Sequence, residues 1–433
     1  MKTVAIIAEY NPFHNGHGYQ LRTISQYFTE MNPQAADDAV RVVIQSGPFV
    51  QRGTPALLDT FTRAEMAVLG GADVVVELPT LFATGSAEIF GTGGVRLAHG
   101  LGADYLAFGA EPQVTTEEPI STLLMKLAQH TTTEDYEQAV QKYLKKKVFY
   151  GTALTKALTD AYPEAAALLD KPNALLGLEY CKAIVRHAPN MEPITIERNS
   201  DYNTTDLDSD NPSATAIRAQ VAKILHDDDM GPHLLEQLLA AMPEDVQDKF
   251  MEAIFQGALT DEERFFDFVL LESRLASESS LEELADFGEG LASLWHRSSM
   301  EPTWDALVKE VKSKRYSYAR LQRMAAYLLL RIKADVRRDA HFTGPTYTRL
   351  LAFNDKGRKW LKATEETRTI PIINKWAPFA KHPEKIVGDF NAPLVATSIA
   401  IDQRATAIQR LCFVNPDYRR GDSYLLYGPR YIK

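Results

Sequence analysis

The feature of this chain that most constrains its fold is a short apolar run, Val4–Ala8, which leads directly into the segment Glu9–His17. An apolar run of this length that breaks at Asn-Pro predicts a buried strand followed by a loop. The loop brings His14 and His17 to the beginning of a helical pattern that continues to Phe28. Residues three positions apart are neighbours on a helical turn. The sequence therefore predicts a strand, a loop and a helix whose first turn carries both imidazoles.

The first turn of that helix is suited to bind a phosphate. Free backbone N–H groups and the positive end of the helix dipole favour an anion there. Gly16 removes a side chain at the point where a nucleotide would approach the backbone. Spacing alone leaves two alternatives open: histidines that only cap a loop, or half of a metal site.

Strand-like and helical segments alternate through the first part of the chain. Val42–Ile44, Asp73–Leu78 and Tyr105–Phe108 are short apolar runs, and helical patterns cover 60–69 and 88–99. This alternation predicts a parallel sheet with right-handed crossovers, which is a Rossmann-like α/β domain. Functional loops in such a sheet lie at the carboxyl ends of the strands. The polar and glycine-rich clusters of this chain follow predicted strands.

The second part of the chain has a different pattern. We predict a Rossmann-like domain over residues 1–225 and a mainly helical region over residues 226–433, with an irregular tail that includes 353–357, 370–373 and 425–427. Helical segments over 121–180, with Lys145–Lys147 on a solvated face, precede a return to the sheet at Ile194–Ile196.

Charge is segregated along the chain. The net charge is -10, but Asp227–Gly290 holds eighteen acidic and three basic residues, whereas Glu301–Leu350 holds eleven basic and five acidic residues. An anionic partner could therefore bind a local basic face even though the whole chain is acidic.

Composition places the protein in the cytoplasm. The N-terminus has no apolar signal segment, and no stretch approaches about twenty apolar residues, so we expect no membrane association. Cys181 and Cys412 form no metal-type pattern, and we expect them to be unpaired buried thiols.

A second motif, Ser213–Arg218, opens another helical pattern. Its hydroxyl groups can cap the helix and donate to phosphate, and Arg218 supplies a charged fork suited to phosphate oxygens. The alternative is an ordinary Ser/Thr cap with a solvent-exposed arginine.

These two motifs, in this order and about two hundred residues apart, resemble those of the nucleotidyltransferases that carry a His-x-Gly-His loop. A closer resemblance, over roughly residues 1–340 and strongest to about Arg218, is to the bacterial tRNA(Met) cytidine acetate ligase family. The segments that carry it are 8–17, 46–56, 77–79, 171–180 and 313–321.

The resemblance implies a reaction and its participants. ATP and acetate would form acetyl-adenylate, with Mg²⁺ offsetting the triphosphate charge, and the acetyl group would pass to N4 of the wobble cytidine of elongator tRNA(Met). It implies no metal site of the protein's own. His14 and His17 would be catalytic. The ATP site would comprise Ile7, Ala8, Glu9, Tyr10, Asn11, Pro12, Phe13, His14, Asn15, Gly16, His17, Gly18, Tyr19, Gln20, Gly109, Asn173, Arg198, Ser213, Thr215 and Arg218.

The chain departs from the family pattern at three places. Ala110 stands where a small hydroxyl residue is expected, Ala174 replaces a second asparagine, and the residues after Arg198 read Asn-Ser-Asp rather than a glycine-rich run. These changes would alter ribose or substrate contacts and leave both histidines in place.

The basic segment Lys309–Arg338 is the candidate RNA-binding surface, because it mixes cations with Tyr316 and Tyr318. The alternative is an amphipathic helix with a solvated basic face. A Gln-Arg pair on the loop after Ile44 could also reach the RNA. The predicted tRNA-binding residues are Gln51, Arg52, Lys314, Arg315, Arg320 and Arg323.

Two other functions remain open from the sequence. One is a small-molecule adenylyltransferase that acts on a phosphopantetheine or mononucleotide acceptor, and the other is a non-catalytic RNA-binding protein with an ATP-binding fold. The sequence also leaves the oligomeric state open.

Overall fold

The computed structural model describes residues 1–31, 33, 39–111, 118–148, 150–197, 213–226, 232–313 and 316–433. The described residues form one eight-stranded sheet with the order β5-β4-β1-β2-β3-β6-β7, and β8 pairs with β6. The five strands of the first half are parallel, which confirms the predicted α/β fold. They are β1 (Lys2–Ala8), β2 (Ala39–Ser46), β3 (Val74–Leu78), β4 (Tyr105–Ala110) and β5 (Glu192–Glu197).

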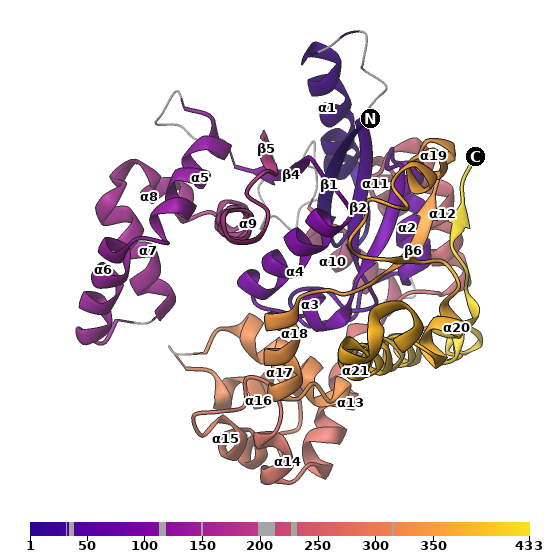
Figure 1. Ribbon diagram of the computed structural model, residues 1–433. Helices are drawn as coiled ribbons and strands as arrows, with labels where there is room; N and C mark the ends of the chain where they lie inside the picture. Colours follow the sequence, from indigo (N-terminus) through magenta and orange to yellow (C-terminus); the bar gives the residue numbers. More distant parts are fainter. Residues whose placement is uncertain are drawn as a thin grey trace.

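Helices cover the sheet where the apolar periodicity placed them (Figure 1). The pattern over 60–69 is a helix with those bounds, and the pattern over 88–99 is a helix one residue longer at each end. These helices are α1 (Asn15–Met31), α2 (Thr60–Leu69), α3 (Thr80–Ala83), α4 (Ala87–Gly100) and α9 (Pro172–His187).

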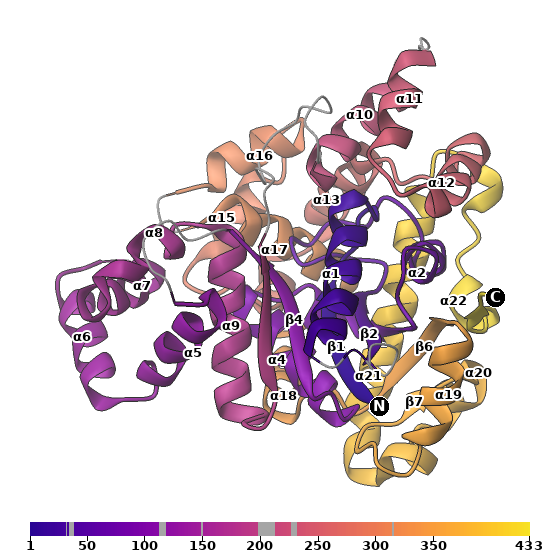
Figure 2. The same cartoon turned by 90° about the horizontal axis from the view of Figure 1, so that it is seen from above.

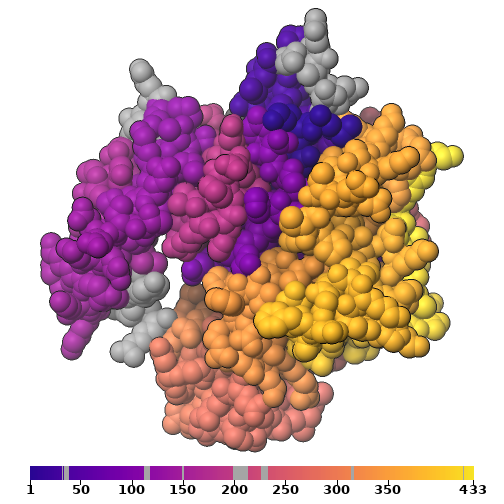
Figure 3. Space-filling view, in the orientation of Figure 1, coloured from indigo at the N-terminus to yellow at the C-terminus, as the bar shows by residue number. Residues whose placement is uncertain are grey.

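A helical lobe lies between β4 and α9 and projects from one side of the sheet (Figures 1 and 3). The lobe is formed by α5 (Ile120–His130), α6 (Glu134–Lys145), α7 (Tyr150–Ala161) and α8 (Ala166–Leu169). Helix α9 packs against both α5 and α4, so the lobe is anchored to the sheet through α9.

The region after β5 is mainly helical up to residue 343, as expected. The helices of this region are α10 (Ala214–His226), α11 (Pro232–Ala240), α12 (Glu244–Gln256), α13 (Glu262–Leu275), α14 (Glu278–Glu282), α15 (Leu291–Ser298), α16 (Trp304–Val311), α17 (Tyr318–Leu330) and α18 (Ala334–Thr343). None of the helices in the described ranges has both the length and the apolar character of a bilayer-spanning segment.

The expectation of an irregular tail is wrong. Strand β6 extends the sheet antiparallel to β3, and α21 is a helix of 28 residues. The helical periodicity was hidden because Gly388 breaks the helix, Pro393 lies inside it, and polar residues such as Asp402 and Gln409 occupy its buried face. The tail comprises β6 (Thr348–Phe353), α19 (Asp355–Ala363), β7 (Ile372–Ile373), α20 (Trp376–Lys381), α21 (Glu384–Leu411), α22 (Ser423–Leu426) and β8 (Arg430–Tyr431).

The division at residue 225/226 stays a prediction, but the sheet itself crosses it. Strands β6, β7 and β8 come from the second half of the chain and complete a sheet that begins at Lys2. The mainly helical second half therefore contributes directly to the α/β core.

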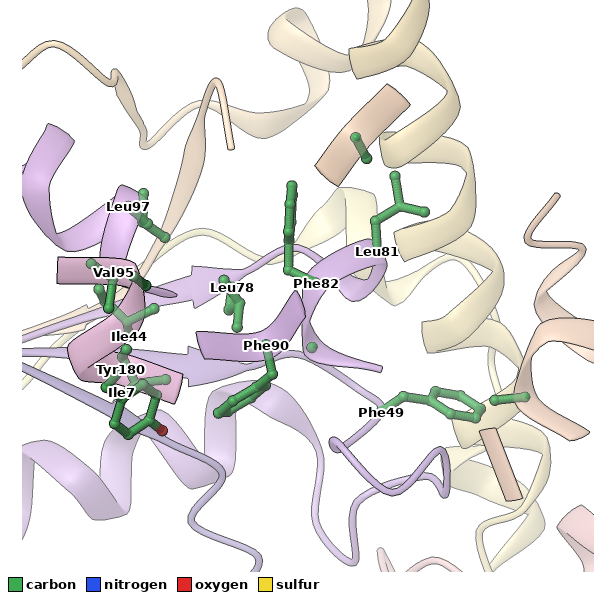
Figure 4. Close-up of a cluster of buried hydrophobic side chains, with 14 of the residues drawn as sticks. Ile7, Ile44, Phe49, Leu78, Leu81, Phe82, Phe90, Val95, Leu97 and Tyr180 are labelled. Carbon is green, nitrogen blue, oxygen red and sulfur yellow. The ribbon is translucent and has the colours of Figure 1, made fainter. Parts of the chain in front are cut away.

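One of the buried hydrophobic clusters lies between the sheet and α4 (Figure 4). Ile7, Ile44 and Leu78 project from three neighbouring strands and share one buried cluster with Phe90 of α4. Helix α4 approaches closely because Gly94 has no side chain: a Cβ there would lie 2.5 Å from Cδ1 of Ile7.

Two ionisable side chains are buried together near the end of β3. The carboxyl groups of Glu77 and Asp402 are both buried, and the hydroxyl groups of Tyr424 and Tyr347 donate to them at 3.2 Å each. The guanidinium of Arg349 lies 4.4 Å from the ring centre of Tyr424. Burial raises the pKa of Glu77 to about 8, and burial raises the pKa of Asp402 to about 6.

These pKa values predict that the free energy of unfolding falls as the pH rises. Both carboxyls hold a proton more tightly in the folded protein than in the unfolded chain, where their pKa values are about 4. Folding therefore takes up protons between about pH 4 and the folded-state pKa, which is about 8 for Glu77 and about 6 for Asp402. Within its range, each group lowers the free energy of unfolding by at most about 1.4 kcal/mol per pH unit. Urea unfolding between pH 5 and 8 should show this loss.

Glu77→Gln should flatten that pH dependence because the amide does not titrate. Glu366→Gln, at an exposed position, is the control, and its free energy of unfolding should change with pH as in the wild type. Equal slopes for Glu77→Gln and wild type would contradict the assignment.

Candidate active site

A cavity of about 210 Å³ opens at the carboxyl ends of the parallel strands. Loops after β1, β2 and β4 reach it, together with the first turns of α1, α9 and α10. This is where a parallel sheet places its functional loops. The cavity is lined by Ile7, Ala8, Glu9, Tyr10, Asn11, His14, His17, Gln20, Val50, Gln51, Arg52, Thr54, Phe90, Phe108, Gly109, Asn173, Leu176, Tyr180, Ser213, Ala214, Thr215 and Arg218.

The two histidine rings lie in contact at the start of α1, with their planes tilted by 32°. Their ring centres lie 3.8 Å apart. The backbone N–H of His14 donates to Nδ1 of His17 at 3.2 Å, and the backbone N–H of Gly16 donates to Nδ1 of His14 at 3.1 Å. A neutral imidazole whose Nδ1 accepts a hydrogen bond carries its proton on Nε2. Each ring therefore has an Nε2–H donor, which suits it to bind an anion.

Gly16 is required by the position of the His14 ring. A Cβ at residue 16 would lie 2.9 Å from Cε1 of His14, so a larger residue would displace the imidazole. The neighbouring residue Asn15 is used differently, because its backbone and side-chain amides donate to the carbonyl oxygens of Ala241 and Ala240. These bonds fix the start of α1 against the segment between α11 and α12.

Helix α10 supplies the other polar wall. The Ser213 hydroxyl accepts from the N–H of Ala216 at 3.1 Å and caps the helix, as the motif predicts. Arg218 donates to the carbonyl oxygen of Asn11 at 2.7 Å and to the Thr215 hydroxyl at 3.2 Å. Arg218 is therefore held beside the histidine loop, with its charge at the cavity.

Asn173 is held in place by a carboxylate that sequence reasoning missed. Glu111, directly after β4, accepts from Nδ2 of Asn173 at 2.8 Å and from the N–H of Ala174 at 3.2 Å. The carboxylate thus binds the N-terminal end of α9, where negative charge is favoured. The bond from Nδ2 to Glu111 fixes the orientation of the Asn173 side-chain amide at the cavity.

The loop after β2 joins the cavity to the helical region. The N–H of Gln51 donates to the Glu9 carboxylate at 2.8 Å, and Arg52 is exposed. Gly53 has φ of 87°, and a Cβ there would lie 2.6 Å from Cα of Arg323 in α17. The structure therefore brings Arg52 and Arg323, two of the predicted RNA contacts, close together.

The basic segment is only partly as predicted. Tyr316 is buried, and the Arg320 guanidinium lies 5.0 Å from its ring centre, so Tyr316 is not the exposed stacking surface that we expected. Tyr318 is 39% exposed, and its hydroxyl accepts from the Trp304 indole at 3.1 Å. Arg198, Lys314 and Arg315 lie outside the described residues.

Most of the predicted ATP-site residues line the cavity. Six members of the histidine segment do not line the cavity: Pro12, Phe13, Asn15, Gly16, Gly18 and Tyr19. Phe13 is buried in the core and Tyr19 is exposed to solvent. Phe90 and Phe108 were missed because buried aromatic side chains look like ordinary core in a sequence. Five other lining residues were not predicted, although they lie in the segments 46–56, 171–180 and 213–218: Val50, Thr54, Leu176, Tyr180 and Ala214.

The class of protein follows from this arrangement. A parallel sheet whose first strand leads into paired histidines, opposite a Ser/Thr/Arg helix start, is the architecture of a HIGH nucleotidyltransferase. The sequence profile described as HIGH Nucleotidyl Transferase matches residues 1–423.

Comparison with relatives and solved structures identifies the family within this class. A tRNA(Met) cytidine acetate ligase of Alkaliphilus metalliredigens is 31% identical over 100% of this chain and 99% of its own length, and one of Geobacillus sp. is 33% identical over 87% of this chain and 89% of its own. The crystal structure of Thermotoga maritima TmcAL bound with alpha-thio ATP covers 100% of both chains with a TM-score of 0.87 and 28% identity. The chain belongs to the tRNA(Met) cytidine acetate ligase family.

Gly16→Ala should weaken ATP binding without weakening the fold. Alanine favours the helix over glycine, but its Cβ would displace the His14 ring. We expect about a tenfold rise in the Kd for ATP by calorimetry, with no fall in the urea midpoint. Gly151→Ala in α7 is the control, because nothing lies within 4 Å of a Cβ there. Unchanged ATP affinity in Gly16→Ala would contradict this role.

Glu111→Gln should weaken ATP binding through Asn173. The carboxylate accepts hydrogen bonds from N–H groups of Asn173 and Ala174. In the variant the NH2 group of glutamine would face one of these donors, so Asn173 would lose its fixed orientation. We expect a several-fold rise in the Kd for ATP, and no further rise when Glu111→Gln is added to Asn173→Ala. Glu118→Gln, which removes only a surface ion pair with Lys126, is the control. Additive losses in the double variant would show that Glu111 does not act through Asn173.

Proposed function

We propose that this protein activates acetate with ATP to form acetyl-adenylate, and transfers the acetyl group to N4 of the wobble cytidine of elongator tRNA(Met). The product is N4-acetylcytidine in the anticodon, made in the cytoplasm. Membership of the tRNA(Met) cytidine acetate ligase family supports this proposal. The residues of the cavity account for the chemistry of the first half-reaction.

The observation that carries the proposal is the paired imidazoles with Nε2–H donors beside the Arg218 guanidinium. In adenylation, a carboxylate oxygen of acetate attacks the α-phosphorus and pyrophosphate leaves. Negative charge increases on the α-phosphate oxygens in the transition state, and fixed N–H donors stabilise it without reorganisation. We assign His14 and His17 to the α-phosphate, and Ser213, Thr215 and Arg218 to the outer phosphates.

The remainder of the nucleotide would occupy the wall formed by β4 and α9. Gly109 allows close approach to the end of β4, and Asn173 lines this wall with its side-chain amide oriented by Glu111. Phe108 and Tyr180, whose ring centres lie 5.4 Å apart, make this wall apolar. Arg198 is proposed as a further phosphate contact on the resemblance to the family.

Mg²⁺ is proposed to accompany ATP. The described residues contain no group of three His, Cys, Asp or Glu side chains placed to hold a metal. Glu9 lines the cavity and is one carboxylate near the proposed phosphate position. This set fits Mg²⁺, which is commonly held by one or two carboxylates and substrate phosphates. When bound, the ion would neutralise triphosphate charge.

The second half-reaction needs the RNA beside the same cavity. The N4 lone pair attacks the acetyl carbonyl, the bond from that carbon to the phosphate oxygen breaks, AMP leaves, and N4 releases one proton. Acetyl-adenylate would hydrolyse in water, so it should be made where the acceptor base can reach it. A base in a single-stranded loop is unstacked more easily than one in a duplex. Arg52 and Arg323 lie at this junction, and we propose them as phosphate contacts, with Gln51, Lys314, Arg315 and Arg320.

The test combines two assays. Wild-type protein should catalyse acetate-dependent exchange of pyrophosphate into ATP, and elongator tRNA(Met) incubated with protein, ATP and labelled acetate should yield labelled N4-acetylcytidine. His17→Ala should lower the exchange rate about a hundredfold or more, which is the usual effect of removing one fixed donor. His382→Ala, on the exposed end of α20, is the matched control and should retain the wild-type rate.

Two results would overturn the proposal. Exchange that depends on phosphopantetheine or a mononucleotide instead of acetate would indicate a small-molecule adenylyltransferase. Binding of tRNA without ATP- and acetate-dependent modification would indicate a non-catalytic RNA-binding protein.

A further inference from the structure

The helical lobe carries an uncompensated patch of lysines. Between Glu137 and Asp160 the chain contains five lysines and no acidic residue. All five are exposed at the end of α6, in the residues that follow it, and in α7. We call this set the lysine surface: Lys142, Lys145, Lys146, Lys147 and Lys156.

No salt bridge within the described part of the chain neutralises the lysine surface. Two of its lysines contact an aromatic ring instead: the ammonium groups of Lys146 and Lys156 lie 5.9 Å and 5.8 Å from the ring centre of Tyr143. The Tyr143 hydroxyl donates to Asp160 at 2.5 Å, so this carboxylate lies beside the patch without forming an ion pair with it. The patch therefore combines five lysines that form no ion pair within the described residues with a partly exposed ring.

The helix dipole explains only part of this charge. Lys142 and Lys145 lie in the last turn of α6, where cations are favoured. Lys147 lies beyond the helix, and Lys156 belongs to α7. Those two lysines contribute nothing to the end of α6, so the cluster requires another explanation.

The other basic region of the chain differs, because two of its cations form ion pairs with the acidic block. Arg331 forms an ion pair with Glu272 at 2.9 Å, and Lys333 forms one with Glu283 at 2.9 Å. Both acids belong to the block 227–290, which is strongly acidic in sequence. The fold thus pairs two cations of the basic segment with the acidic block, whereas no lysine of the lysine surface forms an ion pair among the described residues.

The lobe is also connected to the cavity. Helix α9 packs against α5 and α8 of the lobe, and its residues Asn173 and Leu176 line the cavity. Figures 1 and 2 show the lobe on one side of the sheet, opposite α19 and α20. An RNA whose loop enters the cavity would extend its stem outward. Helices α6 and α7, which carry the lysine surface, form the outer part of the lobe, where such a stem can pass (Figures 1 and 2).

We infer that the lysine surface binds the phosphate backbone of the tRNA substrate outside the anticodon loop. This inference rests on the proposed function. Lysines on a helical surface bind phosphates without reading bases, and duplex RNA is recognised mainly through its shape and backbone. The lysine surface would therefore set affinity and orientation, while the cavity selects the base that is modified.

The test is Lys145→Glu/Lys146→Glu/Lys147→Glu, measured by binding to elongator tRNA(Met) at several salt concentrations. We expect at least a tenfold rise in Kd at low salt and a salt slope that is shallower by about two to three, because each lost phosphate contact removes about 0.9. Acetate-dependent pyrophosphate exchange should keep its wild-type rate. Lys359→Glu/Lys362→Glu/Lys381→Glu, on α19 and α20, is the control with the same change in net charge.

The outcomes separate this inference from the proposed function. Wild-type tRNA affinity in the lysine variant, or equal losses in the lysine variant and the control, would overturn the inference. Failure of the wild-type protein to bind or modify tRNA would instead overturn the proposed function. Loss of pyrophosphate exchange in the lysine variant alone would show that the lobe supports the cavity and does not dock RNA.

Discussion

The Arg63 guanidinium lies in the interior of the protein and donates to three backbone carbonyl oxygens, those of Leu58, Glu9 and Gly47. Burial lowers the pKa of Arg63 to about 10, which leaves it charged at neutral pH. A buried charge is tolerated only when its hydrogen bonds are made. Its three acceptors belong to the ends of two strands and to the loop before α2, so one side chain fixes their relative positions.

Both halves of the cavity depend on this arrangement. Glu9 begins the segment that carries the histidines, and Gly47 begins the loop that carries Gln51 and Arg52. The bond from the Gln51 N–H to the Glu9 carboxylate then joins the two loops a second time. The imidazoles are therefore held in place before any ligand binds, which is what electrostatic catalysis requires.

The second half of the chain completes the site. The Gln409 side-chain amide donates to the carbonyl oxygens of Ala56 and Leu58 at 2.8 Å and 3.0 Å, and the N–H of Thr260 donates to the carbonyl of Leu57 at 2.8 Å. Residues 56–58 are thus fixed from α21 and from the start of α13. The helical region is therefore hydrogen-bonded to the loop that precedes α2, beside the cavity.

The sequence determined the local structure of the site. The apolar run, the Asn-Pro break, Gly16 and the spacing of the two histidines are all short-range features, so they predict the strand, the loop and the helix start without knowledge of the rest. The alternation of strands and helices likewise predicts the parallel sheet, because crossover connections have a strongly preferred hand.

Only the tertiary structure decided what lies around these elements. It brought Glu111 to Asn173, across 62 positions of sequence, and Arg323 to the loop at Gly53. It also showed that the acidic block neutralises part of the basic segment, whereas the lysines of α6 and α7 stay uncompensated. Charge counted along a chain does not predict charge on a surface, because Coulomb energy depends on separation in space and folding sets that separation.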